Sequence, residues 1–246
     1  MLTAGSIRLL NLGPTAWART QSVYRATAEL MPVAGPDTVV FAQSLQPYLS
    51  HGVQQFASEA LDLAACERLG WRVVRRPLPG GAEYCDVNQL LVQWMGPGGA
   101  GSGAAPFIAG VLSTLRDLGV TAEYDGRGQF VTKGACLGTL AAGRLDSAFV
   151  LLGCLYLSYD PQNLARVSFD TRLPNTTSVW AESPRPLAPE MLQGLLIEQL
   201  AFQMGRPIER DTPRLPETRA ARRIEQELLG IEVAEFLQGE AGPAEH

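Results

Sequence analysis

Lysine is almost absent from this chain of 246 residues, in which Lys133 stands alone beside nineteen arginines. Histidine is nearly as rare, because only His51 and the C-terminal His246 occur. A metal site built on histidines is therefore not expected. A serine–histidine–aspartate triad is not expected either, since no Gly-x-Ser-x-Gly segment accompanies His51.

Paired cysteine motifs are missing as well. The four cysteines are scattered without a Cys-x-x-Cys pair, and a chain of this size does not need disulfides to hold its core. We therefore expect reduced thiols, most of them packed in the interior. The four are Cys66, Cys85, Cys136 and Cys154.

Charge and long apolar runs are also scarce. Charged residues make up 18% of the chain and the formal net charge is -5, which argues against a nucleic-acid partner. No apolar run approaches the roughly 20 residues that span a bilayer, and the first twelve residues lack a signal-type stretch. These absences predict a soluble, cytoplasmic protein that does not bind a membrane.

The apolar content of 46% is enough for one sizeable domain, expected over residues 1–237 and followed by a disordered tail over 238–246. Apolar spacing and turn residues predict helices over 22–30, 61–69, 107–118, 187–203 and 217–229. They predict strands over 38–41, 71–76, 89–95, 120–124, 129–132, 138–140 and 148–159. Residues 96–105 are expected to be a flexible connection, and residues 125–128 a hairpin turn. This order fits an α+β (mixed α/β) domain with mixed, largely antiparallel sheets flanked by helices.

Residues 75–86, with the sequence RRPLPGGAEYCD, form the first segment of chemical interest. Two arginines end a predicted strand, and Gly80 and Gly81 let the backbone approach a ligand closely. Backbone amides beside a guanidinium can hold a phosphate or a carboxylate. A proline-rich turn with two glycines is also compatible with a turn that has no such role.

Residues 128–140, with the sequence GQFVTKGACLGTL, form the second segment. Lys133 lies here among small residues that would admit a thin, extended substrate. Arginine cannot replace a compact amine that must approach an acyl or phosphoryl oxygen, so this solitary lysine is our candidate for that contact. A surface lysine at the end of a strand is the alternative.

Together the two segments resemble motifs of the lipoate–protein ligase and octanoyltransferase family, within the biotin/lipoate protein ligase superfamily. Residues 75–86 are similar to the motif RR-x-[ST]-GGGAV-x-HD, and residues 133–138 to K-[IV]-A-x-x-G. Residues 47–55 and 152–160 resemble two further strands of that family, the second with Leu152 in place of a histidine. The ordered series covers roughly residues 7–229. Arg75, Arg76, Gly80, Gly81, Ala82, Tyr84 and Asp86 fit the first motif, whereas Leu78, Pro79, Glu83 and Cys85 depart from it.

The resemblance implies a ligase-type catalytic domain in which both segments line one acyl channel. Lys133 would contact the acyl carbonyl as the catalytic residue, and no metal-ligating residue is implied. The implied substrate- and nucleotide-binding residues are Arg75, Arg76, Gly80, Gly81, Ala82, Tyr84, Gly134, Ala135 and Gly138.

Three activities stay open at this point. A lipoate–protein ligase would activate lipoate or octanoate with ATP and Mg²⁺, and attach it to a lysine of a lipoyl-domain protein of the 2-oxoacid dehydrogenase E2 or glycine-cleavage H type. An octanoyltransferase would accept octanoate from acyl-carrier protein as a cysteine thioester, for which Cys85 and Cys136 are the candidate thiols. A non-catalytic relative would only bind the acyl group or the lipoyl domain. A ligase of this length would need a separate small accessory chain, or would carry out only the transfer half of the reaction.

Overall fold

The structure is a computed structural model that describes residues 3, 5–32, 35–97, 103–169, 175–185 and 187–230. The predicted tail over 238–246 and the middle of the predicted connection over 96–105 lie outside the described residues. The two ends of that connection belong to regular elements, namely the last residues of one strand and the first of one helix.

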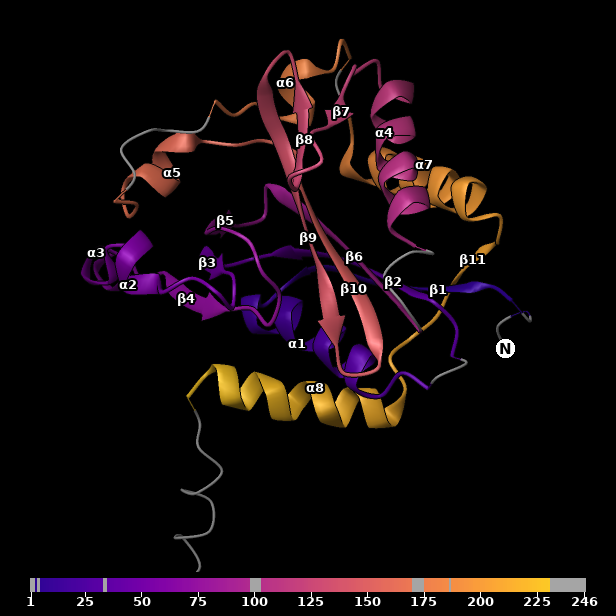
Figure 1. The fold of residues 1–246 in the computed structure, drawn as a ribbon, viewed down its shortest axis with the longest axis horizontal. Helices are drawn as coiled ribbons and strands as arrows, with labels where there is room; N and C mark the ends of the chain where they lie inside the picture. The colour runs from indigo at the N-terminus through magenta and orange to yellow at the C-terminus, as the bar shows by residue number, and fades with distance from the viewer. Residues whose placement is uncertain are drawn as a thin grey trace, which may run out of the picture.

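A mixed sheet of eight strands forms the centre of the fold (Figure 1). Its strands are β1 (Ile7–Thr15), β2 (Thr38–Ser44), β6 (Gln89–Pro97), β7 (Glu123–Tyr124), β8 (Gln129–Thr132), β9 (Ala135–Leu145), β10 (Ala148–Tyr156) and β11 (Ile208–Arg210). They lie in the order β11-β1-β2-β6-β10-β9-β8-β7. Strand β1 runs parallel to both neighbours, and the other pairs in this sheet are antiparallel.

A second sheet holds β3 (Tyr48–His51) between β4 (Arg72–Arg75) and β5 (Glu83–Cys85). The pair β3–β4 is parallel and β3–β5 is antiparallel. The short helices α2 (Ala57–Ala60), α3 (Leu63–Arg68) and α5 (Pro161–Ala165) lie near this sheet, and α6 (Val179–Glu182) lies near β8 (Figure 1).

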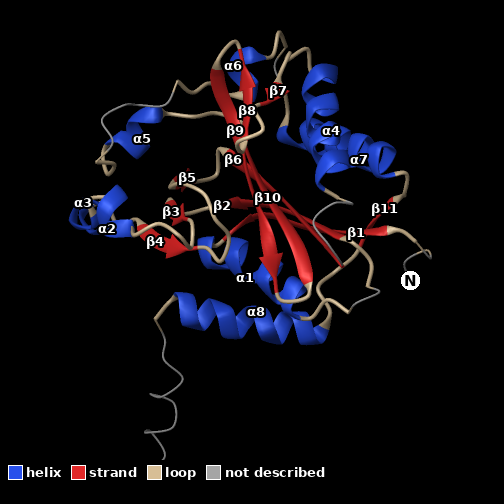
Figure 2. Ribbon diagram, in the orientation of Figure 1, coloured by secondary structure: helices blue, strands red, loops and turns tan. Residues whose placement is uncertain are grey.

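Helices cover both faces of the large sheet (Figure 2). Helices α4 (Ala104–Asp117) and α7 (Pro189–Met204) pack on one face over side chains such as Leu9, Val92 and Leu151. Helices α1 (Trp17–Glu29) and α8 (Leu215–Leu228) cover the other face. Alternate residues of a strand point to opposite faces of the sheet. Because helices cover both faces, the central strands are apolar on both. The mixed α/β class with flanking helices is confirmed. Within the described ranges, no helix is both long and apolar enough to cross a membrane.

Most predicted elements are present with shifted ends, and two differences have a clear cause. Strand β1 was not predicted because the buried Arg8 interrupts its apolar pattern and Pro14 lies near its end. Helix α1 begins five residues before the predicted start at residue 22. Its first turns bury polar residues, among them Gln21, whose Nε2 donates to the Tyr48 hydroxyl at 3.0 Å. Polar residues satisfied in the interior are indistinguishable from surface residues in a hydrophobicity pattern.

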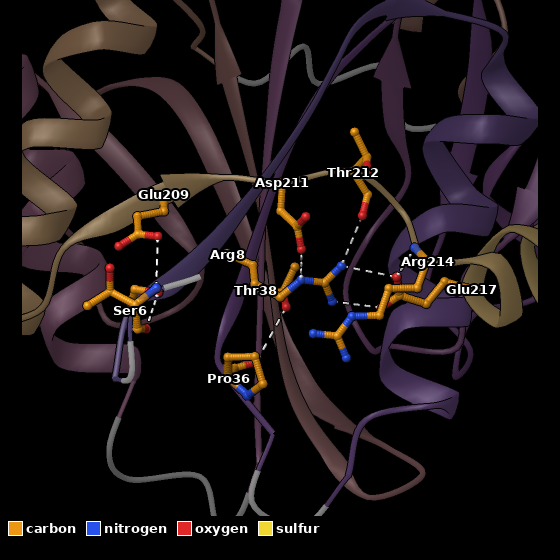
Figure 3. Close-up of polar contacts among 10 residues, drawn as sticks. Ser6, Arg8, Pro36, Thr38, Glu209, Asp211, Thr212, Arg214 and Glu217 are labelled. Carbon is orange, nitrogen blue, oxygen red and sulfur yellow. Dashed lines mark hydrogen bonds and ion pairs between the residues drawn. The ribbon is translucent and has the colours of Figure 1, made fainter. Parts of the chain in front are cut away.

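Helix α8 also differs from expectation, because one of its charges faces the interior. Arg8 is 3% exposed and donates through Nη1 to Glu217 at 2.7 Å and through Nε to Asp211 at 2.8 Å (Figure 3). The carboxylate of Glu217 also accepts from the backbone N–H of Arg214 at 2.6 Å. This buried network connects β1 to α8, the helix that covers one face of the large sheet together with α1.

Candidate functional site

A cavity of about 190 Å³ is bounded by residues of both sheets. That is smaller than the ~300–1,000 Å³ of sites for drug-sized ligands, so it suits a narrow ligand. One wall is apolar and comes from the large sheet, with Leu91, Leu140, Ala141, Leu152 and Gly153. The other residues of the lining are Gln21, Tyr48, Ser50, Arg76, Gly80, Gly81, Ala82, Glu83, Cys85, Gln93, Arg127, Gly128, Gln129, Thr139 and Cys154.

Arg76 holds the loop between β4 and β5 in shape. Its side chain is buried and donates to the carbonyl oxygens of Ser50 at 3.0 Å, Pro79 at 3.2 Å and Gly81 at 2.9 Å. One arginine can bind all three carbonyls because its planar guanidinium carries several N–H donors in a fixed arrangement. The two terminal nitrogens of the guanidinium are therefore engaged with the protein's own backbone and shape the cavity, while its buried Nε has no partner among the described residues.

The glycines of this loop fit that arrangement. Gly80 has a φ of 120°, and a Cβ there would collide with the Arg76 guanidinium. Gly52, on the opposite segment, passes so close to the backbone of Gly80 that a Cβ would not fit, and its N–H donates to the Gly80 carbonyl at 3.1 Å. Gly81 has open space where a Cβ would lie. At Gly80 the group that approaches closely is the Arg76 guanidinium, and the close approach of a ligand to this glycine pair stays a prediction.

Glu83 brings a carboxyl group into the cavity. Its Oε1 accepts from the Tyr156 hydroxyl at 2.7 Å, and its Oε2 accepts from the Thr139 hydroxyl at 2.8 Å. Burial raises the pKa of Glu83, and the two hydroxyl donors with the nearby Arg76 charge lower it by less. A carboxyl group whose pKa is shifted by burial in a cavity is a common feature of functional sites. The sequence alone marked Glu83 only as a departure from the family motif.

Arg127 lies at the exposed edge of the same cavity, on the turn between β7 and β8. Its backbone N–H donates to the Asp125 carboxylate at 2.7 Å, which fixes the turn. Arg127 and Arg76 are the two basic residues of the cavity lining. It was not singled out from the sequence, where it belongs to an ordinary hairpin signal.

Lys133 occupies a different place. It lies with Gly134 in the two-residue turn between β8 and β9, where both have positive φ values, 48° and 79°. Such a turn directs its corner side chains to solvent. The Lys133 side chain is 82% exposed, and its Nζ donates to Glu182 at 2.9 Å. Lys133 does not line the cavity, and its assignment as the acyl-contacting residue stays a prediction.

The cavity gathers five of the residues chosen from the sequence, namely Arg76, Gly80, Gly81, Ala82 and Cys85. The remaining ones lie elsewhere. Arg75 is exposed and its Nε donates to the Val53 carbonyl at 3.1 Å, while the Tyr84 ring packs on Trp71 at 5.0 Å between centroids. Gly138 allows β9 to approach the carbonyl of Cys154. The others outside the lining are Gly134, Ala135 and Cys136.

Two glutamines in the lining were missed, Gln21 and Gln93. Gln93 is 2% exposed in the centre of an apolar strand, and its Nε2 donates to the Thr20 carbonyl at 2.9 Å. A single polar residue inside an apolar strand is the sequence signal that could have pointed to it, because buried polar groups need partners.

The four cysteines are free and buried, as expected. Burial raises the pKa of Cys136 to about 11, and the Cys85 thiol followed by burial raises the pKa of Cys154 well above its usual value. Both groups are therefore protonated thiols at neutral pH, and a thiol is a weak nucleophile. Within the part of the chain that the structure describes, no three histidine, cysteine or acidic side chains come together as metal ligands.

Comparison with known proteins places this fold. Among solved structures, a bi-partite lipoate protein ligase with its E2 lipoyl domain from Thermoplasma acidophilum has a TM-score of 0.81 at 17% identity, covering 91% of this chain and 92% of that one. A T. acidophilum protein with bound lipoic acid gives 0.79 at 18%, covering 90% and 95%. A lipoate-protein ligase A bound with ATP gives 0.80 at 18%, also covering 90% and 95%. No curated protein matches the sequence. The lipoyl protein ligase A/B catalytic domain matches residues 14–185, and this chain belongs to that family.

Proposed function

We propose that this protein binds a lipoyl or octanoyl group in the cavity between its two sheets and attaches it to a lysine of a lipoyl-domain protein, using ATP to activate the acyl group. The observation that carries the proposal is the narrow cavity with an apolar wall beside the loop of Gly80, Gly81 and Ala82. A thin aliphatic chain would bury its surface against Leu91, Leu140 and Leu152.

Three residues of the cavity lining would each have a different role in this activity. Arg76 would hold the glycine loop in its shape, because its two terminal nitrogens donate to three backbone carbonyls. Gly81 leaves room for a ligand to meet the backbone. Arg127 would supply positive charge for a carboxylate or phosphate at the exposed edge of the cavity.

ATP and a lipoyl-domain acceptor are proposed because one similar protein was solved with ATP and another with its E2 lipoyl domain. Mg²⁺ bound with ATP is held mainly by phosphates and water, with one or two carboxylates, so it requires no cage made by the protein alone. A glycine-cleavage H type acceptor is the other candidate, which the family resemblance implies.

The test uses the purified full-length chain with lipoate or octanoate, ATP and Mg²⁺, followed by addition of a lipoyl domain. We expect an acyl-adenylate by mass spectrometry, and then an acceptor whose mass increases by one acyl group at its lysine. Omission of ATP is the control and should leave the acceptor unchanged. Binding of neither acid by calorimetry would overturn the proposal.

A second candidate is binding of the acyl group without turnover, which the position of Lys133 favours. The only lysine of the chain points to solvent and pairs with Glu182. In this case lipoate binds, yet neither adenylate nor modified acceptor forms, even with a small accessory chain supplied. The thioester route is disfavoured for Cys136 by its raised pKa, and an octanoyl adduct on Cys85 or Cys136 after incubation with octanoyl-carrier protein would revive it.

A further inference from the structure

The cavity is more polar than a plain aliphatic chain requires. Besides its apolar residues it is lined by Glu83, Gln93, Ser50 and Tyr48, side chains that carry carboxyl, amide and hydroxyl groups. Burying such groups against a hydrocarbon costs free energy unless each finds a hydrogen-bond partner.

Two of these groups still have acceptor capacity. A carboxylate has about four lone-pair positions, and Glu83 uses two of them for Tyr156 and Thr139. The Oε1 atom of Gln93 is buried and has no partner among the described residues. Its assignment as the oxygen follows from the other end of the amide, which donates to a backbone carbonyl that can only accept.

Gln93 Oε1 is therefore an acceptor without a partner among the described residues, and Glu83 is the acidic group of the same lining. Leaving a buried acceptor unpaired costs free energy, so a ligand that donates to it binds more tightly than one that does not. A cationic donor would gain more, because Glu83 is the acidic group in the lining and Arg76 is engaged with backbone carbonyls.

We propose that the cavity selects an acyl chain that carries a hydrogen-bond donor, best an amino group, which pairs with Glu83 while the carboxylate end lies toward Arg127. This rests on the proposed function, and it narrows the substrate class from plain octanoyl or lipoyl groups to amino-substituted acyl groups. The donor would reach Gln93 or Ser50 as a second acceptor.

The experiment measures by calorimetry the binding of octanoate, lipoate and 8-aminooctanoate to the full chain. We expect 8-aminooctanoate to bind at least about tenfold more tightly than octanoate, which corresponds to ~1.4 kcal/mol. In Glu83→Gln, which keeps an acceptor oxygen for the hydroxyl donors but loses the charge, the preference should fall to about two- to threefold or less. Glu83→Val should prefer octanoate, and circular dichroism checks that both variants fold.

The outcomes separate the two claims. Octanoate or lipoate binding as tightly as 8-aminooctanoate overturns the inference and leaves the proposed function standing. A preference that Glu83→Gln leaves unchanged also overturns it, since the selecting group would then lie elsewhere. If none of the three acids binds to the wild-type protein, the proposed function and the inference fall together.

Discussion

The loop at Arg76 and the turn at Lys133 each place a basic side chain next to glycines, and the two differ in what the basic group contacts. Arg76 is 7% exposed and bonds to three backbone carbonyls, so its charge organises the chain around the cavity. Lys133 is at a hairpin corner, where its side chain is 82% exposed and its partner is the one carboxylate of Glu182. Glycines beside a cation thus serve two purposes, close packing in one place and a tight turn in the other.

Replacing Arg76 should have the largest effect on the free energy of unfolding and on ligand binding. In Arg76→Met, three inward carbonyls lose their donor, and we expect the free energy of unfolding to fall by about 2–4 kcal/mol with ligand binding lost. The matched control is Arg75→Met, which alters the exposed neighbour and should cost less than about 1 kcal/mol. Urea denaturation of both variants measures this. Equal losses would mean that the loop does not depend on the buried guanidinium.

Filling the cavity should affect binding more than stability. Ala141 lines the cavity, whereas Ala142, the next residue of β9, is exposed. We expect Ala141→Phe to weaken acyl binding by at least about 100-fold and Ala142→Phe by less than about twofold. Calorimetry with octanoate and with 8-aminooctanoate measures both. Unchanged binding by Ala141→Phe would place the acyl chain outside this cavity.

The two glutamates of the compared regions should respond to pH with opposite signs. Burial raises the pKa of Glu83 above its usual value of 4.5, so the stability it contributes is present below that value and is lost as pH rises through the raised pKa. The Lys133 hydrogen bond lowers the pKa of Glu182, so its contribution is present above 4.5 and is lost as pH falls through the lowered pKa.

Denaturation at a series of pH values compares each glutamine variant with the wild type. The wild type should lose stability relative to Glu83→Gln as pH rises above 4.5, and should lose a little relative to Glu182→Gln as pH falls below it. The second effect is the smaller because that pair is exposed. Parallel pH curves for the wild type and Glu83→Gln would mean that this carboxyl titrates as it does in water.

The sequence predicted the class of the fold and singled out five of the twenty residues that line the cavity, for physical reasons that can be named. Strands such as β8 and helices such as α4 have a clean apolar period, and the motif at 75–86 is contiguous, so local patterns suffice. The position of Glu83 inside the cavity depends on Tyr156 and Thr139, more than fifty residues away. Nor does any local pattern report whether a lysine beside a glycine faces a ligand or a turn.

The smallest expected effect comes from Lys133→Ala, and it decides what the turn does. Because the Lys133–Glu182 pair is exposed, its removal should lower the free energy of unfolding by about 0–1 kcal/mol. Acyl binding should change by less than about twofold, since the side chain does not line the cavity. Calorimetry and transfer to a lipoyl domain are measured on the same preparation, with Lys133→Arg as the charge-preserving control. The family resemblance implies that Lys133 contacts the acyl group. Loss of transfer with binding intact would support that contact, and would mean that the hairpin takes another arrangement during transfer.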